Sequence, residues 1–156
     1  MYNRQFMVEA IRLAKENVKN GTGGPFGAVI VKDGEVIVSC VNTVTPDNDP
    51  TAHAEVNAIR EACRKLKTYQ LEGCEIYASC EPCPMCLGAI YWARPSKVYY
   101  ASTKEEAAGA GFDDSFIYKE ITLLGDERSI PFLKIEEQGA GEEFNLWNAS
   151  DSKELY

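Results

Sequence analysis

Residues 75–93, which read EIYASCEPCPMCLGAIYWA, decide the fold of this chain. A short apolar run at 75–78 predicts a strand, and a longer apolar run at 84–93 predicts a helix with Pro84 in its first turn. Three cysteines lie within seven residues around the start of that helix: Cys80, Cys83 and Cys86. A Cys-x-x-Cys pair at a helix start lets two sulfurs converge on one metal ion. The segment therefore predicts a strand, a metal-binding turn and a helix in succession.

The rest of the chain alternates between helical and extended patterns. Apolar residues at helical spacing predict helices at 4–18 and 52–67, with shorter helical pieces at 104–108 and 115–121. Other runs predict strands at 27–32, 35–41, 97–101 and 131–136, and Asp33-Gly34 predicts a hairpin between the first two. Two prolines and two aspartates predict a loop at 43–50. This order predicts an α/β fold of three layers, α/β/α, on a mixed sheet of about five strands.

Size and charge restrict the kind of protein. The chain has 156 residues, which fits a single domain over 1–156. Its formal net charge of −8 argues against binding along a nucleic-acid backbone, because such binding needs clustered lysines and arginines. No apolar stretch approaches the roughly 20 residues that a membrane span needs, and the first residues hold no signal-peptide hydrophobic region. We therefore expect a cytoplasmic protein that binds neither nucleic acid nor membrane.

A second motif, His53-Ala54-Glu55, lies at the start of the predicted helix 52–67. Together with Pro-Cys-x-x-Cys, in this order and separated by one helix and one strand, it is typical of zinc deaminases that act on nucleobases. His53 is the only histidine of the chain, so no other imidazole can serve a zinc site. We predict that His53, Cys83 and Cys86 bind one Zn²⁺ per subunit and leave its fourth position to water, with Glu55 nearby as a base.

The spacing of His53 and Glu55 restricts how the helix can meet the zinc. Residues i and i+2 of a regular helix point about 200° apart. Both side chains can therefore reach one site only if the end of the helix points at the metal. The zinc-protease motif His-Glu-x-x-His is excluded, because the residue four after His53 is Asn57.

Two other interpretations of the cysteines stay open. Cys80 stands three residues before Cys83 and could complete a closed, structural site of three cysteines and one histidine, with no catalysis. Cys83 and Cys86 could instead form a redox pair, although that leaves His53 without a role. The remaining cysteines are expected to be buried packing residues: Cys40, Cys63 and Cys74.

A planar base needs a flat apolar slot with a few aimed polar groups. Phe26, in the Gly-Gly-Pro-Phe segment before the first strand, can present an aromatic face or belong to the core. Asn42 follows the second strand and can both donate and accept hydrogen bonds. Of the pair Asp113 and Asp114, either can face the pocket, and Asp113 can instead cap the following helix. Trp92 can line the pocket or pack against the fold.

The chain resembles the bacterial guanine deaminases of the cytidine deaminase-like superfamily over nearly its whole length. The segments that carry the resemblance are GGPFGAVIVKDG, NDPTAHAEVNAIR, SCEPCPMCLGAIYWARP and GFDDSFIYKEI. The zinc motifs specify only the superfamily, whereas GFDDSF together with a C-terminal tyrosine narrows it to guanine deaminases.

The resemblance implies a cytidine deaminase-like fold and hydrolysis of guanine to xanthine and ammonia by zinc-activated water, with Glu55 as proton shuttle. It implies that Asn42 and the backbone of Ala54 hold the purine, that Phe26 packs on it, and that Asp114 contacts it and assists the leaving amine. It also implies a homodimer that exchanges the C-terminal segment 139–156, so that Tyr156 reaches the partner's active site. The zinc core alone leaves other substrates open: cytosine, a nucleoside or an adenosine in transfer RNA.

Overall fold

The computed structural model describes residues 2–156 and divides the chain into two units. The first unit ends at Asp114, and the second comprises Ser115–Tyr156. The helices of the first unit are α1 (Arg4–Lys19), α2 (Val44–Asp47), α3 (Ala54–Leu66), α4 (Pro84–Ala93) and α5 (Lys104–Gly109), and its strands are β1 (Gly27–Lys32), β2 (Glu35–Val41), β3 (Cys74–Cys80) and β4 (Lys97–Ser102). In residues 2–156, no helix is both long and apolar enough to cross a membrane.

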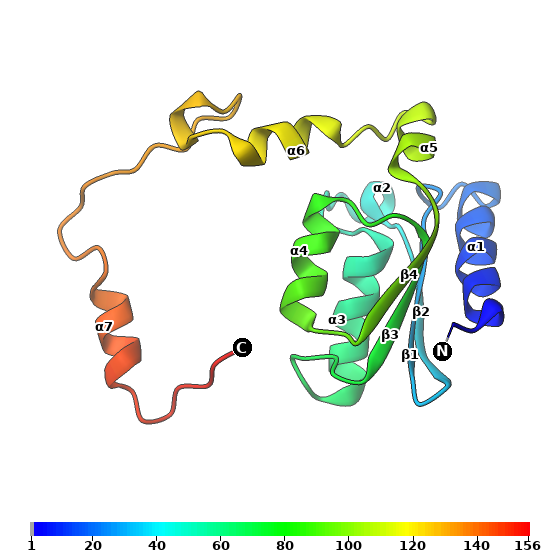
Figure 1. The fold of residues 1–156 in the computed structure, drawn as a ribbon, viewed down its shortest axis with the longest axis horizontal. Coiled ribbons are helices and arrows are strands. Elements are labelled where there is room, and N and C mark those ends of the chain that lie inside the picture. Colours follow the sequence, from blue (N-terminus) through cyan, green and yellow to red (C-terminus); the bar gives the residue numbers. More distant parts are fainter. Residues whose placement is uncertain (1) are drawn as a thin grey trace. The chain divides into compact units, whose positions relative to one another are not determined.

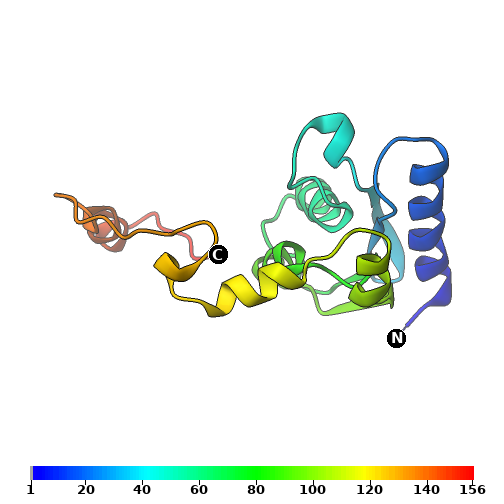
Figure 2. The same ribbon diagram turned by 90° about the horizontal axis from the view of Figure 1, so that it is seen from above.

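The first unit has the expected three layers. Helix α1 covers one face of the sheet, and α3 and α4 cover the other (Figures 1 and 2). The strand order is β2-β1-β3-β4, with β1 antiparallel to both of its neighbours and β3 parallel to β4. Asp33 and Gly34 join β1 to β2 with positive φ angles of 52° and 82°, as a tight hairpin turn requires. The α/β fold, the mixed sheet and the hairpin are confirmed.

Strand β1 is buried on both faces because helices lie on both sides of it. Ala28 and Ile30 point into the core that α3 and α4 cover, while Val29 and Val31 point into the core beneath α1. The face of α3 toward the sheet carries three fully buried alanines at a spacing of four residues: Ala54, Ala58 and Ala62. Small side chains on this face allow the helix axis to approach the sheet closely.

The strand count differs from the prediction. Within residues 2–156 the sheet has four strands, and residues 131–136, expected to form a strand, have no regular secondary structure. A strand forms only where a neighbour accepts its hydrogen bonds, which the amino-acid pattern of one segment cannot reveal. The expected loop at 43–50 also contains the short helix α2, and α3 begins at Ala54 rather than at residue 52.

The second unit contains α6 (Ser115–Thr122), the 3₁₀ turn η1 (Gly125–Glu127) and α7 (Glu142–Ala149). No residue between 115 and 156 is buried, and most of its large apolar side chains are exposed. The unit therefore has no hydrophobic core of its own. That the segment belongs to one domain with the rest of the chain stays a prediction.

Replacing Gly27 with alanine tests how closely α1 packs on β1. A Cβ at position 27 would overlap the carbonyl oxygen of Ala10 and lie 2.9 Å from the Cβ of Leu13, so the helix or the strand would have to move. We expect Gly27→Ala to lower the free energy of unfolding by about 1–3 kcal/mol, measured by urea denaturation. Gly109→Ala is the control, because no atom lies within 4 Å of its Cβ position. Unchanged stability of the Gly27 variant would contradict the close packing.

Candidate metal centre and active site

Two helices begin at the same place, beyond the carboxyl end of β3. His53 is the N-cap of α3 and Cys83 is the N-cap of α4, and both have extended backbone angles. Neither side chain caps its own helix, although N-cap side chains usually accept a hydrogen bond from the first turn. Both instead point at a common centre, which Cys86 joins from the first turn of α4. The helix-end arrangement required by the spacing of His53 and Glu55 is therefore present.

The three side chains fit one tetrahedral zinc ion. Their ligand atoms all lie within 4.8 Å of one another. The Nδ1 atom of His53 lies 3.5 Å from the Sγ atom of Cys83 and 3.5 Å from that of Cys86. Zinc–sulfur bonds of about 2.3 Å and zinc–nitrogen bonds of about 2.0–2.1 Å, at a tetrahedral angle, place nitrogen and sulfur about 3.5 Å apart. The cluster thus has the donor atoms and the spacing that zinc requires.

The cluster favours a thiolate. Hydrogen bonds from Cys86 and from His53 lower the pKa of Cys83 to about 4, against the opposing effect of burial. The proton that Cys86 shares with Cys83, together with burial, raises the pKa of Cys86. The hydrogen bond with Cys83 raises the pKa of His53. The amides of two helix N-termini add partial positive charge at the same point and stabilise negative sulfur, and the thiolate in turn attracts a metal cation.

Glu55 lies beside the cluster in the first turn of α3. Its side chain is buried, and its Oε2 atom accepts a hydrogen bond of 3.6 Å from the Cys86 thiol. Burial raises the pKa of Glu55. A buried carboxyl next to a metal cluster is well placed to accept and return a proton.

Cys80 does not belong to the metal cluster. Its buried thiol donates to the carbonyl oxygen of Thr103 at 3.6 Å, and burial raises its pKa to about 11. In residues 2–156, the group of potential ligands contains only His53, Cys83 and Cys86. This arrangement favours an open site over the closed site of three cysteines and one histidine. Disulfides are also absent there, since all six cysteines are free thiols.

Asn42 uses its side-chain oxygen, and not its amide nitrogen, to bond to other groups within residues 2–156. Its Oδ1 atom accepts from the backbone of Gly24 at 3.4 Å and of Val44 at 3.2 Å, and the residue is 6% exposed. These two bonds fix the oxygen inward. In the described part of the chain, no hydrogen bond is formed by the Nδ2 atom, which remains accessible to solvent. Asn42 can therefore donate to an acceptor on a bound molecule.

Two further asparagines, the buried Asn17 and the half-buried Asn57, support this region, and neither is predicted as a site residue from the sequence. Asn17 of α1 donates through Nδ2 to the carbonyl oxygens of Gly24 and Asn42, both at 2.8 Å. A polar residue on the buried stripe of α1, in line with Met7, Ala10 and Ala14, was the available signal. The other is Asn57 of α3, whose side chain reaches the end of β2.

The other predicted substrate residues differ in their surroundings. Phe26 is half-buried, packs against the core and meets Phe112 edge-to-face at 5.0 Å. Asp114 is half-buried, and both burial and the Cys83 thiolate raise its pKa, whereas Asp113 is exposed. Ala54 is fully buried in the first turn of α3, where backbone N–H groups have no partner within the helix.

The structure does not bring two predicted residues to the cluster within the first unit. Trp92 lies toward the far end of α4 from Cys83, with 63% of its surface exposed. Tyr156 belongs to the second unit and is 68% exposed. For both residues, a role in the active site stays a prediction.

The fold and the metal cluster define a class of zinc hydrolases, and comparison with known proteins identifies the family. The model of the cytidine and deoxycytidylate deaminase zinc-binding region matches residues 1–102. The chain belongs to this family of zinc-binding deaminases.

Three relatives or solved structures are particularly similar. A guanine deaminase of Bacillus subtilis (strain 168) is 56% identical over 156 residues, which is 100% of both chains. The X-ray structure of guanine deaminase from Bacillus subtilis has a TM-score of 0.97 at 56% identity and matches 100% of this chain and 99% of that one. A tRNA-specific adenosine deaminase of Aquifex aeolicus (strain VF5) is 45% identical over 109 residues, 70% of this chain and 72% of the relative.

Cysteine variants distinguish the open site from the closed one. We expect Cys80→Ser to retain one zinc per chain, because its thiol bonds to a backbone carbonyl rather than facing the cluster. Cys86→Ser should lose zinc, because it removes one of three ligand atoms. Atomic absorption measures the metal, and the thiolate-to-cobalt absorption band of cobalt-substituted protein checks the ligands. Loss of zinc from the Cys80 variant would contradict the open site.

Proposed function

We propose that this protein hydrolyses guanine to xanthine and ammonia. The observation that carries the proposal is the 56% identity to a guanine deaminase over the full length of both chains. The zinc core alone would not suffice, because a tRNA-specific adenosine deaminase shares it over 70% of this chain. The net charge of −8 favours a small base over transfer RNA, whose phosphates require basic residues.

In the proposed site, His53, Cys83 and Cys86 hold the zinc. Bound there, zinc supplies a Lewis acid that makes a coordinated water more acidic. Two thiolates offset its charge, so this acidification is weaker than at a zinc with three histidines. A neighbouring base is correspondingly important, and Glu55 is the buried carboxylate next to the cluster.

Glu55 moves the protons of the reaction. Its carboxylate accepts a proton from the attacking water, whose oxygen bonds to C2 of guanine. Glu55 then gives that proton to a ring nitrogen. The second proton of the water reaches the departing amine through Glu55 or Asp114, the C2–N bond breaks, and ammonia and xanthine leave. The buried position of Glu55 supports this role, since it shields the proton from bulk water.

Four further residues orient the base in this proposal. The free amide nitrogen of Asn42 donates to the purine, as does a first-turn amide at Ala54. Phe26 packs on the flat ring, and its edge-to-face contact with Phe112 fixes its plane. Asp114 contacts the amino side of guanine.

Replacing Glu55 with glutamine tests the proposed activity. We expect wild-type, zinc-loaded protein to release ammonia and xanthine from guanine, and Glu55→Gln to lower kcat by about 10²–10⁴-fold, because glutamine cannot carry a proton. Zinc content should stay the same, since Glu55 is not a ligand. Ammonia is measured by a coupled assay and xanthine by chromatography. Absence of ammonia release by the wild type would refute the guanine assignment, and retained turnover in the variant would refute the shuttle.

We also propose a homodimer in which the segment 139–156 is exchanged between subunits and Tyr156 reaches the partner's active site. Two features support it. The second unit buries none of its residues, so it needs apolar cover from another surface. Helix α4, which begins at the metal cluster, also exposes apolar side chains along its length, with Leu87 at 42% and Tyr91 at 74% exposure. Trp92, on the same helix, would then be covered by the second copy.

Hybrid dimers test the exchange. Glu55→Gln and Tyr156→Ala are each expected to be inactive as homodimers. In a hybrid with exchanged tails, the site that keeps Glu55 receives Tyr156 from the other subunit, so one of the two sites works again. We expect co-expression to restore guanine turnover, measured on the doubly tagged hybrid. A hybrid as inactive as its parents would contradict the exchange.

A cytoplasmic location also belongs to this proposal. All six cysteines are free thiols, and the proposed zinc site needs two of them as thiolates. A reducing compartment keeps such thiols available.

A further inference from the structure

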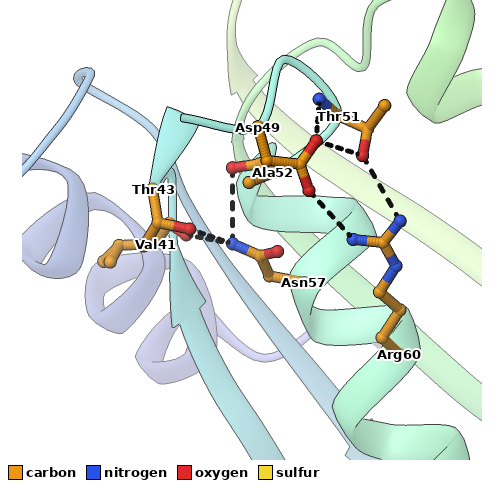
Figure 3. A network of polar contacts seen from close by, with 7 residues as sticks. All are labelled: Val41, Thr43, Asp49, Thr51, Ala52, Asn57 and Arg60. Carbon is orange, nitrogen blue, oxygen red and sulfur yellow. Dashed lines mark hydrogen bonds and ion pairs between the residues drawn. The ribbon is translucent and has the colours of Figure 1, made fainter. Parts of the chain in front are cut away.

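The side-chain amide of Asn57 in α3 bonds to the chain on both sides of Asn42 and to the residue before His53. Asn57 lies in the first part of α3, and its backbone N–H donates to the carbonyl oxygen of His53 at 2.9 Å. Its Nδ2 atom lies 3.0 Å from the carbonyl oxygen of Val41, 3.0 Å from the Oγ1 of Thr43 and 3.3 Å from the carbonyl oxygen of Ala52 (Figure 3).

The positions of these acceptors are informative. Val41 and Thr43 are the residues on either side of Asn42, and Ala52 directly precedes His53. The Ala52 carbonyl also accepts from the backbone N–H of Thr43 at 2.9 Å. Asn57 therefore joins the chain around the proposed substrate amide to the chain that enters the metal cluster. The carbonyl oxygens of Val41 and Ala52 can only accept, so the amide nitrogen must face them, and its two hydrogens are shared among these two carbonyls and the Thr43 hydroxyl.

A second contact holds the same loop but does not reach residues 41–43. Arg60, three residues along α3, lies 3.7 Å from Asp49 and donates to the Oγ1 of Thr51 at 3.3 Å (Figure 3). About half of the Arg60 side chain is exposed, at 49%, and exposed ion pairs contribute little. Asp49 is also held locally, because it accepts from the backbone and hydroxyl of Thr51. Arg60 provides a matched control on the same helix face.

We propose that Asn57 is a positioning residue for substrate binding. It fixes the position of Asn42 relative to the start of α3, and it acts on the substrate through Asn42. This inference rests on the proposed function. From the other side, Asn42 is held by Asn17 and by the backbone of Gly24. Removing Asn57 frees the chain on the α3 side only. Asn42 would then donate to the base less well, while the metal cluster and Glu55, which α3 and α4 themselves carry, keep their places.

Asn57→Asp is the diagnostic variant, because it keeps the size of the side chain and replaces the donor with an oxygen that faces three oxygens. We expect it to raise KM for guanine about tenfold, the effect of losing about one hydrogen bond, and to raise the inhibition constant of xanthine equally. The value of kcat and the zinc content should stay close to those of the wild type. A purely structural role would instead lower the unfolding temperature and the active fraction, and leave KM unchanged.

Combining Asn57→Asp with Asn42→Ala tests whether Asn57 changes KM through Asn42. If Asn57 acts through Asn42, Asn57→Asp should change KM little when Asn42 is already alanine. Thr43→Val removes one acceptor of Asn57, should raise KM in the same direction, and replaces the aspartate variant if that variant does not fold. Arg60→Gln should leave KM within about twofold of the wild type, because its contacts are exposed.

Amide hydrogen exchange at Thr43 provides a readout that is independent of the reaction. The Thr43 N–H, bonded to Ala52, should exchange faster in Asn57→Asp and not in Arg60→Gln. Three results would overturn the proposal. KM could be unchanged in folded variants of Asn57 and Thr43, or the effect of Asn57→Asp on KM could add fully to that of Asn42→Ala. Arg60→Gln could also raise KM as much as Asn57→Asp does. Wild-type protein without guanine turnover would refute the proposed function, and the exchange measurement would then decide whether Asn57 holds the loop.

Discussion

The convergence of two helix N-termini on one point is the constraint on which the rest of the structure depends. The first residues of α3 and α4 supply His53, Cys83 and Cys86, whose ligand atoms lie within 4.8 Å of one another. The two N-cap side chains, His53 and Cys83, point at this cluster and do not cap their own helices, although N-cap side chains usually bond to the first turn. Such proximity also requires α3 to lie close against the sheet, which its buried alanines permit.

Side-chain amides, rather than regular secondary structure, fix the loops around this point. The end of β2 has no further strand partner, and asparagines provide the missing hydrogen bonds: Asn17 from α1, on one side of the sheet, and Asn57 from α3, on the other. In the described part of the chain, no buried side-chain nitrogen or oxygen lacks a hydrogen bond. Such hydrogen bonds hold the end of β2 and the start of α3 in one fixed arrangement. Position 23 shows how tight the network is, since a Cβ there would overlap the carbonyl oxygen of Asn42.

Sequence reasoning succeeded where local pattern and chemistry agree. The pattern of apolar residues predicted the helices α1, α3, α4, α5 and α6 and all four strands of the sheet, and the ligand spacing predicted the cluster of His53, Cys83 and Cys86. It did not decide the role of Cys80, because only the fold turns that thiol toward Thr103 rather than toward the cluster. It was wrong about a strand at 131–136, because strand formation depends on a neighbour that the segment itself does not contain. The sequence gives no sign of the role of Asn57, since hydrogen bonds to residues 14 and 16 positions away have no local signature.

The family match covers the metal cluster but not the whole chain. The metal cluster and Glu55 lie inside residues 1–102, the region shared with other zinc deaminases. The same zinc core can serve deaminases of different bases. Asp114 and the whole second unit lie outside it. Of the residues proposed to contact guanine, Asp114 and Tyr156 are therefore the two that the shared region does not supply, whereas Phe26, Asn42 and Ala54 lie within it.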